Sequence, residues 1–78
     1  MVTETAAAPV IGQFHFYSTP SLVTPAWRVY RDGVALGLVE RHSAGFGAYT
    51  PGREMSRGGM KSRREAADWL WARAQAGA

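Results

Sequence analysis

The chain has 78 residues, of which 46% are hydrophobic, so we expect one small folded domain rather than a disordered chain. Its net charge is +3, and it contains no cysteine, which excludes disulfides, thiol nucleophiles and thiolate metal sites. The two histidines are too few for an all-histidine metal site, and no apolar run is long enough to cross a membrane. We therefore expect no metal, no cofactor and no membrane contact. Because the first ten residues lack the pattern of a signal peptide, we also expect a cytoplasmic protein.

Residues 1–10 are predicted to form a disordered tail, followed by a single domain over residues 11–78. The first expected strand covers residues 13–17, where Phe14 and Phe16 share one face and polar residues and a tyrosine share the other. Two prolines mark residues 18–25 as a connecting loop, from which Leu22 and Val23 could reach the core.

A β-hairpin is predicted around Asp32 and Gly33, because this pair favours a two-residue type I′ turn in which both residues have positive φ. The turn fixes the register, so that Val29 is expected opposite Leu36. The predicted core face carries Trp27, Val29, Leu36 and Leu38. The opposite face is mixed basic and aromatic, and it is predicted to carry Arg28, Tyr30, Ala35, Gly37, Val39 and Arg41.

A further strand is predicted over residues 46–50, after a polar loop at residues 42–45. With this loop Tyr49 would lie on the core face beside Leu38, and Phe46 and Ala48 would lie on the other face with Arg41 and Val39, whereas a slip by one residue would reverse the faces. Residues 51–61 are rich in Gly and Arg and are predicted to form a long, mobile loop.

The C-terminal part is predicted to be a helix over residues 62–74. Ser62 and Glu65 have the spacing of a capping box, in which each side chain accepts a hydrogen bond from the backbone amide of the other residue. The apolar stripe of this helix consists of Ala66, Ala67, Leu70, Trp71 and Ala74. The fold class is therefore α+β, with a small three- to four-stranded antiparallel sheet and one C-terminal helix packed on one face.

Positive charge is concentrated in residues 51–64, which hold five basic residues and one acidic residue. A basic stretch beside a sheet face with Arg and Tyr favours contact with phosphates and bases, although the same residues also fit a solvated loop and an ordinary half-solvated face. On this hypothesis the chain binds DNA or RNA through Arg28, Tyr30, Arg41, Arg53, Arg57, Lys61, Arg63 and Arg64.

No residue pattern indicates catalysis, since Asp32 and Glu65 already have roles in a turn and a helix cap. We therefore expect a binding protein that is not an enzyme. The alternative to nucleic-acid binding is a protein–protein interaction module that binds a host protein or a second copy of this chain. It would use Tyr30, Phe46 and Trp69, or an open sheet edge.

Residues 26–74 follow the order strand, strand, strand, helix, with Trp27, Val29, Asp32 and Gly33 in the hairpin and Ser-x-x-Glu-Ala-Ala at the helix start. In these features the chain resembles the arm-type DNA-binding domain of phage tyrosine integrases and other small sheet-plus-helix domains of phages and actinobacteria. The resemblance implies that the sheet contacts DNA at the positions of Arg28, Tyr30 and Arg41. The short chain, rich in Ala, Gly and Arg, also looks like a phage-encoded accessory protein. The chain departs from those domains in its long basic segment at residues 51–61.

Overall fold

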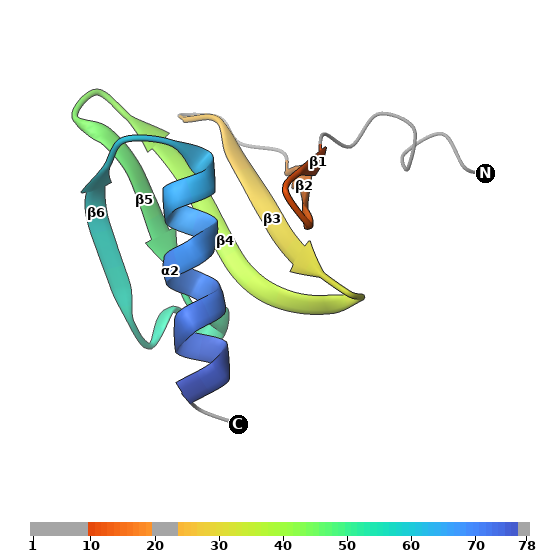
Figure 1. Ribbon diagram of the computed structural model, residues 1–78. Coiled ribbons are helices and arrows are strands. Elements are labelled where there is room, and N and C mark those ends of the chain that lie inside the picture. Colours follow the sequence, from red (N-terminus) through yellow and green to blue (C-terminus); the bar gives the residue numbers. More distant parts are fainter. Residues whose placement is uncertain (1–9, 20–23, 77–78) are drawn as a thin grey trace.

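The computed structural model describes residues 10–19 and 24–76, which form an antiparallel sheet and a C-terminal helix (Figure 1). The strands are β1 (Val10–Ile11), β2 (Phe14–Ser18), β3 (Ala26–Arg31), β4 (Val34–His42), β5 (Gly45–Tyr49) and β6 (Ser56–Met60). Each strand pairs with the next one along the chain, so the sheet order is β1-β2-β3-β4-β5-β6. The helix is α2 (Arg63–Ala76), and a 3-10 turn, η1 (Pro51–Arg53), joins β5 to β6. The predicted α+β class is confirmed, with more strands than the three to four expected.

The added strands lie at the two ends of the sheet. Val10, which the sequence assigned to a disordered tail, belongs to β1 and pairs with His15 of β2. The rest of that tail and the predicted core residues Leu22 and Val23 lie outside the described residues. The prediction of a long loop at residues 51–61 is wrong, because β6 pairs with β5 there. Of the five residues of β6 only Met60 is buried, so this strand has no alternating apolar pattern that the sequence could reveal.

The turn between β5 and β6 is held by one threonine. The Thr50 hydroxyl accepts a hydrogen bond from the Met55 amide at 2.9 Å and donates one to the Met55 carbonyl oxygen at 3.2 Å. The Thr50 amide donates to the same carbonyl oxygen at 2.9 Å. These bonds close the turn, so the segment is ordered by side-chain to backbone contacts rather than by apolar burial.

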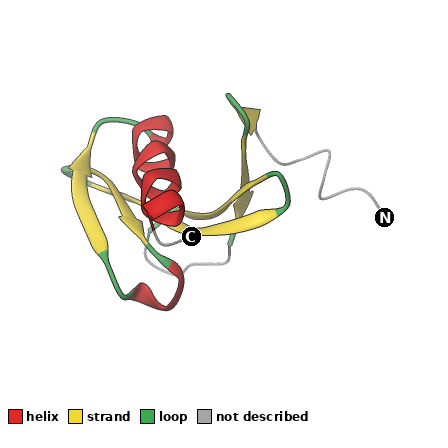
Figure 2. Ribbon diagram, turned by 60° about the horizontal axis from the view of Figure 1, so that its bottom comes forward, coloured by secondary structure: helices red, strands yellow, loops and turns green. Residues whose placement is uncertain are grey.

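One face of the sheet, here called the helix face, is covered by α2, which lies between β6 and β2 (Figure 2). The core between them is apolar, and its buried members are Phe14, Phe16, Val29, Leu36, Val39, Ala48, Met60, Ala66, Ala67 and Leu70. The small Ala66 and Ala67 let the helix approach the sheet closely, and Leu70 fills the space beside them. The predicted stripe is thus confirmed at its centre, whereas Trp71 is half-buried and Ala74 is exposed.

The helix begins as the sequence predicts. The Ser62 hydroxyl oxygen accepts a hydrogen bond from the Glu65 amide at 3.1 Å. The Glu65 carboxylate, however, accepts from the amide of Lys61 at 2.9 Å, one residue before the expected partner Ser62. Both ends of the cap are therefore used, and the carboxylate also lies near the positive end of the helix dipole.

Two arginines fix the helix to β2 and β3. The guanidinium carbon of Arg63 lies 4.8 Å from the ring centre of Trp27 and 5.4 Å from that of Phe16. About two turns further along the helix, the guanidinium carbon of Arg31 lies 4.3 Å from the ring centre of Trp71. Cation–π contacts of this kind add to the apolar packing, so these two arginines act in folding.

The hairpin between β3 and β4 determines which side chains reach the core. Asp32 and Gly33 have φ values of 52° and 78°, which confirms the predicted turn with positive φ at both positions. After Tyr30 the register shifts, because Leu36 is the extra residue of a β-bulge, and Val29 therefore lies opposite Gly37 instead of Leu36. From this point on, the strand presents the opposite faces to those predicted.

The bulge corrects several predicted faces. Val39, expected on the face opposite the core, is fully buried on the helix face. Arg41, which was expected beside it, also lies on the helix face, because residues two apart in a strand share a face. Leu38, expected in the core, lies on the opposite face. The predicted pairing of β4 with β5 is confirmed, since Leu38 lies opposite Tyr49. Both residues, however, lie on the face opposite the helix and not on the predicted core face. Ala48, opposite Val39, is consequently in the core rather than outside it, and Phe46 shares its face.

Candidate nucleic-acid interface

The face of the sheet opposite α2, here called the open face, carries a row of four side chains across four strands. Tyr17 of β2 lies opposite Arg28 of β3, Arg28 lies opposite Leu38 of β4, and Leu38 lies opposite Tyr49 of β5. Tyr17, Leu38 and Tyr49 are half-buried and Arg28 is exposed. Because α2 packs on the other face, no helix within residues 10–19 and 24–76 covers this row.

Tyr30 adds a second aromatic ring beside the row. Its ring centre lies 5.4 Å from that of Tyr17, with an angle of 86° between the ring planes, an edge-to-face arrangement that aromatic pairs favour. His15 lies opposite Tyr30 on the neighbouring strand. The open face therefore presents a fixed pair of tyrosine rings with a guanidinium group next to them.

At the other end of the row, a carboxylate is held between two basic side chains. The Glu40 side chain is 17% exposed, and its Oε1 lies 3.3 Å from His42 Nε2, while its Oε2 lies 3.5 Å from Arg53 Nη2. The guanidinium carbon of Arg53 lies 4.7 Å from the ring centre of Tyr49. Arg53 thus pairs with the Glu40 carboxylate and covers an aromatic ring at the same time.

The surroundings of Tyr49 change its titration. Partial burial raises the pKa of the Tyr49 hydroxyl above its usual value of 10.0. The charge of Glu40 and a hydrogen bond to it raise the pKa further, and the charge of Arg53 opposes them. Tyr49 is therefore a neutral phenol at physiological pH, and it donates its hydrogen bond to the Glu40 carboxylate.

The structure separates the basic residues that the sequence grouped together. Arg28, Tyr30 and Arg53 belong to the open face, as described above. Arg41 is exposed but lies on the helix face, opposite Phe46. Arg63 packs on the rings of Trp27 and Phe16, so it is part of the fold rather than a free cation. Arg28 and Arg41 therefore cannot contact the same ligand through one flat surface.

The remaining predicted cations lie away from the row. Arg64 is on the helix, where its Nε lies 3.4 Å from the carboxylate of Asp68. Arg57 lies in the end strand β6, opposite Ala48, and Lys61 connects β6 to the helix. Arg57 and Lys61 are exposed, and they lie beyond β5, where the row ends.

The residues predicted for the alternative protein contact do not form one exposed patch. Phe46 is half-buried and its ring centre lies 6.3 Å from that of Trp27. Trp69 is half-buried against the core, with the guanidinium carbon of Arg73 5.8 Å from its ring centre. Tyr30 lies on the opposite face of the sheet from Phe46.

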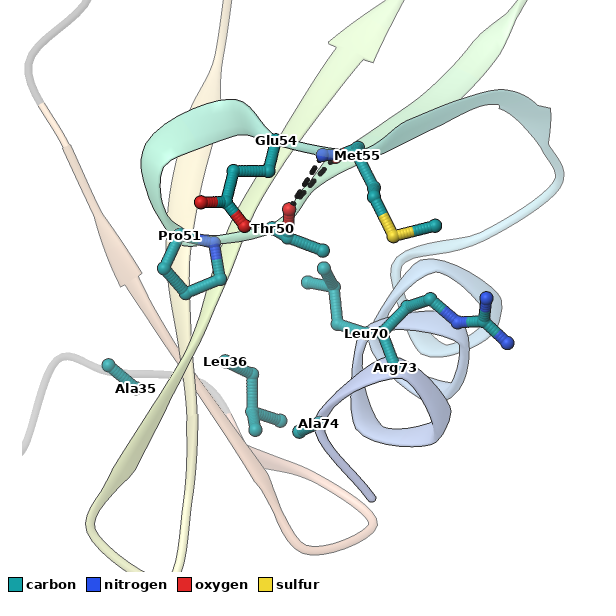
Figure 3. Close-up of a pocket in the computed structure, with 9 residues that line it drawn as sticks. All are labelled: Ala35, Leu36, Thr50, Pro51, Glu54, Met55, Leu70, Arg73 and Ala74. Carbon is teal, nitrogen blue, oxygen red and sulfur yellow. Dashed lines mark hydrogen bonds between the residues drawn. The ribbon is translucent and has the colours of Figure 1, made fainter. Parts of the chain in front are cut away.

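A half-open pocket of about 400 Å³ lies between α2 and the turn from β5 to β6 (Figure 3). Leu36, Leu70 and Ala74 give it an apolar wall, and Glu54 and Arg73 stand at its edge. In Figure 3 the guanidinium group of Arg73 points away from the carboxylate of Glu54, so the two charged groups do not converge on one point. Small-molecule sites need such convergent polar groups, which makes the open face the stronger candidate.

Sequence reasoning missed Leu38, Glu40 and Tyr49 as members of the open face, and it placed Tyr17 on the face opposite Phe14 and Phe16 without counting it among the site residues. One signal pointed to the missed residues, because a glycine inside a strand often marks a bulge, and Gly37 stands inside β4. A bulge before Leu38 would have exchanged the faces of the rest of the strand and brought Leu38, Glu40 and Tyr49 to the side of Arg28.

Within residues 10–19 and 24–76, no cluster of three potential ligand residues could hold a metal ion, and no helix is long and apolar enough to span a membrane. The sequence matches no protein-family model, and neither a curated protein nor a solved structure is found to match it. The resemblance to integrase DNA-binding domains thus stays a prediction, and the open face must be interpreted from its own chemistry.

Proposed function

We propose that this protein is a non-enzymatic nucleic-acid-binding protein that uses the open face of its sheet. One observation carries the proposal: Arg28 is exposed, forms no ion pair within the described residues, and lies in a row between Tyr17 and Leu38. A guanidinium group binds phosphate oxygens in a bidentate manner, and neighbouring tyrosine rings offer surfaces for sugars and bases.

Electrostatics support an anionic ligand. The chain has a net charge of +3, which attracts a polyanion at a distance. The carboxylate of Glu40 would repel phosphate, but Arg53 lies beside it and compensates its charge, with His42 also in contact. Arg53 is 62% exposed and retains donors that can turn toward a phosphate group.

A salt-dependent binding assay tests this proposal. Fluorescence anisotropy of labelled single-stranded and duplex DNA is measured at about 50 and 200 mM salt, a range in which proteins with many phosphate contacts lose most of their affinity. We expect binding at the lower salt that weakens at the higher salt, because phosphate neutralisation releases counterions. Absence of binding at the lower salt would contradict the proposal.

Arg28 and Arg41 provide a matched pair of variants. Both are exposed arginines on neighbouring strands, but they lie on opposite faces of the sheet. Arg28→Ala is expected to weaken binding by about tenfold, as loss of a charged hydrogen bond does, while Arg41→Ala changes the net charge equally and keeps most of the affinity. Equal losses in the two variants would show that only overall charge matters and would contradict the assignment to the open face.

The tyrosines and Arg28 are also residue types enriched in protein interfaces, so a protein partner is the second candidate. The unpaired cation in the middle of the row favours the nucleic acid, because an apolar protein contact would leave that charge buried. The proposed ligand also implies a location where nucleic acid is accessible, which for the producing cell is the cytoplasm.

A further inference from the structure

We infer that the open face binds single-stranded nucleic acid, by stacking bases on its tyrosines, in preference to a duplex. This inference rests on the proposed function and specifies its ligand. It follows from three properties of the open face: its width, the position of its rings and its small number of free cations.

The row is too wide to enter a DNA groove. Tyr17 and Tyr49 are separated by three inter-strand steps, which is about 14 Å at roughly 4.8 Å for each step. The major groove of B-DNA is about 12 Å wide and admits a helix or a two-stranded ribbon. Both tyrosines therefore cannot reach base edges of one duplex at the same time, whereas an unpaired strand can lie across the whole row.

The rings are placed where stacking is possible. Tyr17 and Tyr30 come from neighbouring strands and are both half-buried, so the sheet fixes each ring while part of it stays accessible. Tyr49 is also half-buried, and Arg53 already covers one side of its ring. Tyr17 and Tyr30 hold each other edge to face, so their side chains have little conformational freedom left to lose when a base stacks on them. Proteins that bind single strands without strong sequence preference use fixed aromatic side chains of this kind.

The cations of the open face are too few for a duplex binder. Tight contact with a duplex commonly neutralises about six to ten phosphates. Arg28 lies on the row, and Arg53 beside it is already shared with Glu40. With so little charge available, most of the affinity must come from the rings, and only unpaired bases expose the flat surfaces that rings can stack on.

The inference is tested with three labelled ligands of equal strand length and the unmodified protein. They are a single-stranded pyrimidine DNA, the same strand with several abasic sites, and the corresponding duplex. All three carry the phosphate backbone, but only the first offers bases for stacking. At about 50 mM salt we expect the intact strand to bind at least about fivefold more tightly than the abasic strand, the lower end for loss of one stacked base. We also expect it to bind more tightly than the duplex.

A tyrosine variant links the result to the open face. Tyr30→Leu removes the ring but keeps an apolar side chain, and we expect it to weaken binding of the intact strand by at least about fivefold, with little effect on the abasic strand. Tyr30→Phe keeps the ring and should retain most of the affinity. Thermal unfolding of both variants checks that they are folded.

The outcomes separate the inference from the proposed function. If the duplex binds as tightly as the intact strand, or the abasic strand binds equally well, the single-strand inference is overturned while nucleic-acid binding stands. If none of the three ligands binds at the lower salt, the proposed function itself fails, and the inference with it.

Discussion

Val29 lies directly opposite Gly37, because Leu36 forms a β-bulge two residues after the start of β4. This single irregularity places Val39 in the core and Leu38 on the open face. It also sends Arg28 and Arg41 to opposite sides of the sheet. The composition of the candidate interface is therefore a consequence of the bulge.

The bulge predicts that Gly37 tolerates no side chain. Its φ of 143° is rarely adopted by other residues, and an added Cβ would collide with the Tyr49 carbonyl oxygen and lie 3.1 Å from a methyl group of Leu70. We expect Gly37→Ala to lower the free energy of unfolding by more than about 2 kcal/mol in urea denaturation. Gly58 is the matched control, since an added Cβ there meets nothing within 4 Å, and Gly58→Ala should change stability by less than about 0.5 kcal/mol.

Truncating the centre of the helix tests the core. Leu70 is 1% exposed and packs among the buried residues of the sheet. Leu70→Ala should lower the free energy of unfolding by about 2 to 5 kcal/mol, because the cavity it leaves adds to the lost burial. Val34, an aliphatic residue that is 54% exposed, is the control. A loss for Leu70→Ala below about 1 kcal/mol, within the range of surface changes, would contradict this placement of the helix.

The helix cap is expected to contribute measurably. Ser62→Ala removes the acceptor of the Glu65 amide and should reduce the free energy of unfolding by about 1 kcal/mol. Ser43, an exposed residue in the turn between β4 and β5, provides the control, and Ser43→Ala should have little effect. Equal effects of the two substitutions would mean that the cap adds nothing to stability.

Tyr49 predicts a dependence of stability on alkaline pH. Its pKa is raised in the folded state, so the unfolded chain loses this proton first as the pH increases. The Tyr49 contribution to stability is therefore fully present below about pH 10 and is lost as the pH rises through the higher pKa of the folded state. The difference between the tyrosinate absorbance titrations of the native chain and of Tyr49→Phe should have its midpoint above 10.0.

Variants of Glu40 and Arg53 test the direction in which each neighbour shifts the pKa of Tyr49. Glu40→Gln removes a charge that raises the pKa of Tyr49, so the midpoint should fall. Arg53→Ala removes a charge that lowers it, so the midpoint should rise. Shifts in the same direction for both variants would contradict the arrangement of Glu40 and Arg53 around Tyr49.

The sequence predicted the elements whose signals are local. The turn at Asp32 and Gly33 needs only two residues with positive φ, and the helix start needs only the spacing of Ser62 and Glu65. Strand β6 was missed because Thr50 orders its turn through hydrogen bonds that leave no apolar pattern. The fold class followed from the local elements without knowledge of these details.

The candidate site was predicted less well than the fold. Arg28 and Tyr30 were placed correctly because the extra residue of the bulge, Leu36, belongs to β4, so the alternation of faces along β3 is not interrupted. Beyond Leu36, every residue assigned by alternation was inverted, since a one-residue shift exchanges the two faces of a strand. Arg63 was grouped with the free cations, although its packing on Trp27 depends on the helix meeting β3, a contact that has no local signature.

The most direct measurement is an NMR titration of the 8.5 kDa protein with a single-stranded oligonucleotide at low salt. The two faces carry their own aromatic reporters: the rings of Tyr17, Tyr30 and Tyr49 on the open face, and the indoles of Trp69 and Trp71 on the helix. We predict that the tyrosine ring resonances and the Arg28 side-chain resonance shift as ligand is added, while the two indole resonances stay in place. Shifts of the indoles without shifts of the tyrosine rings would contradict the assignment of binding to the open face.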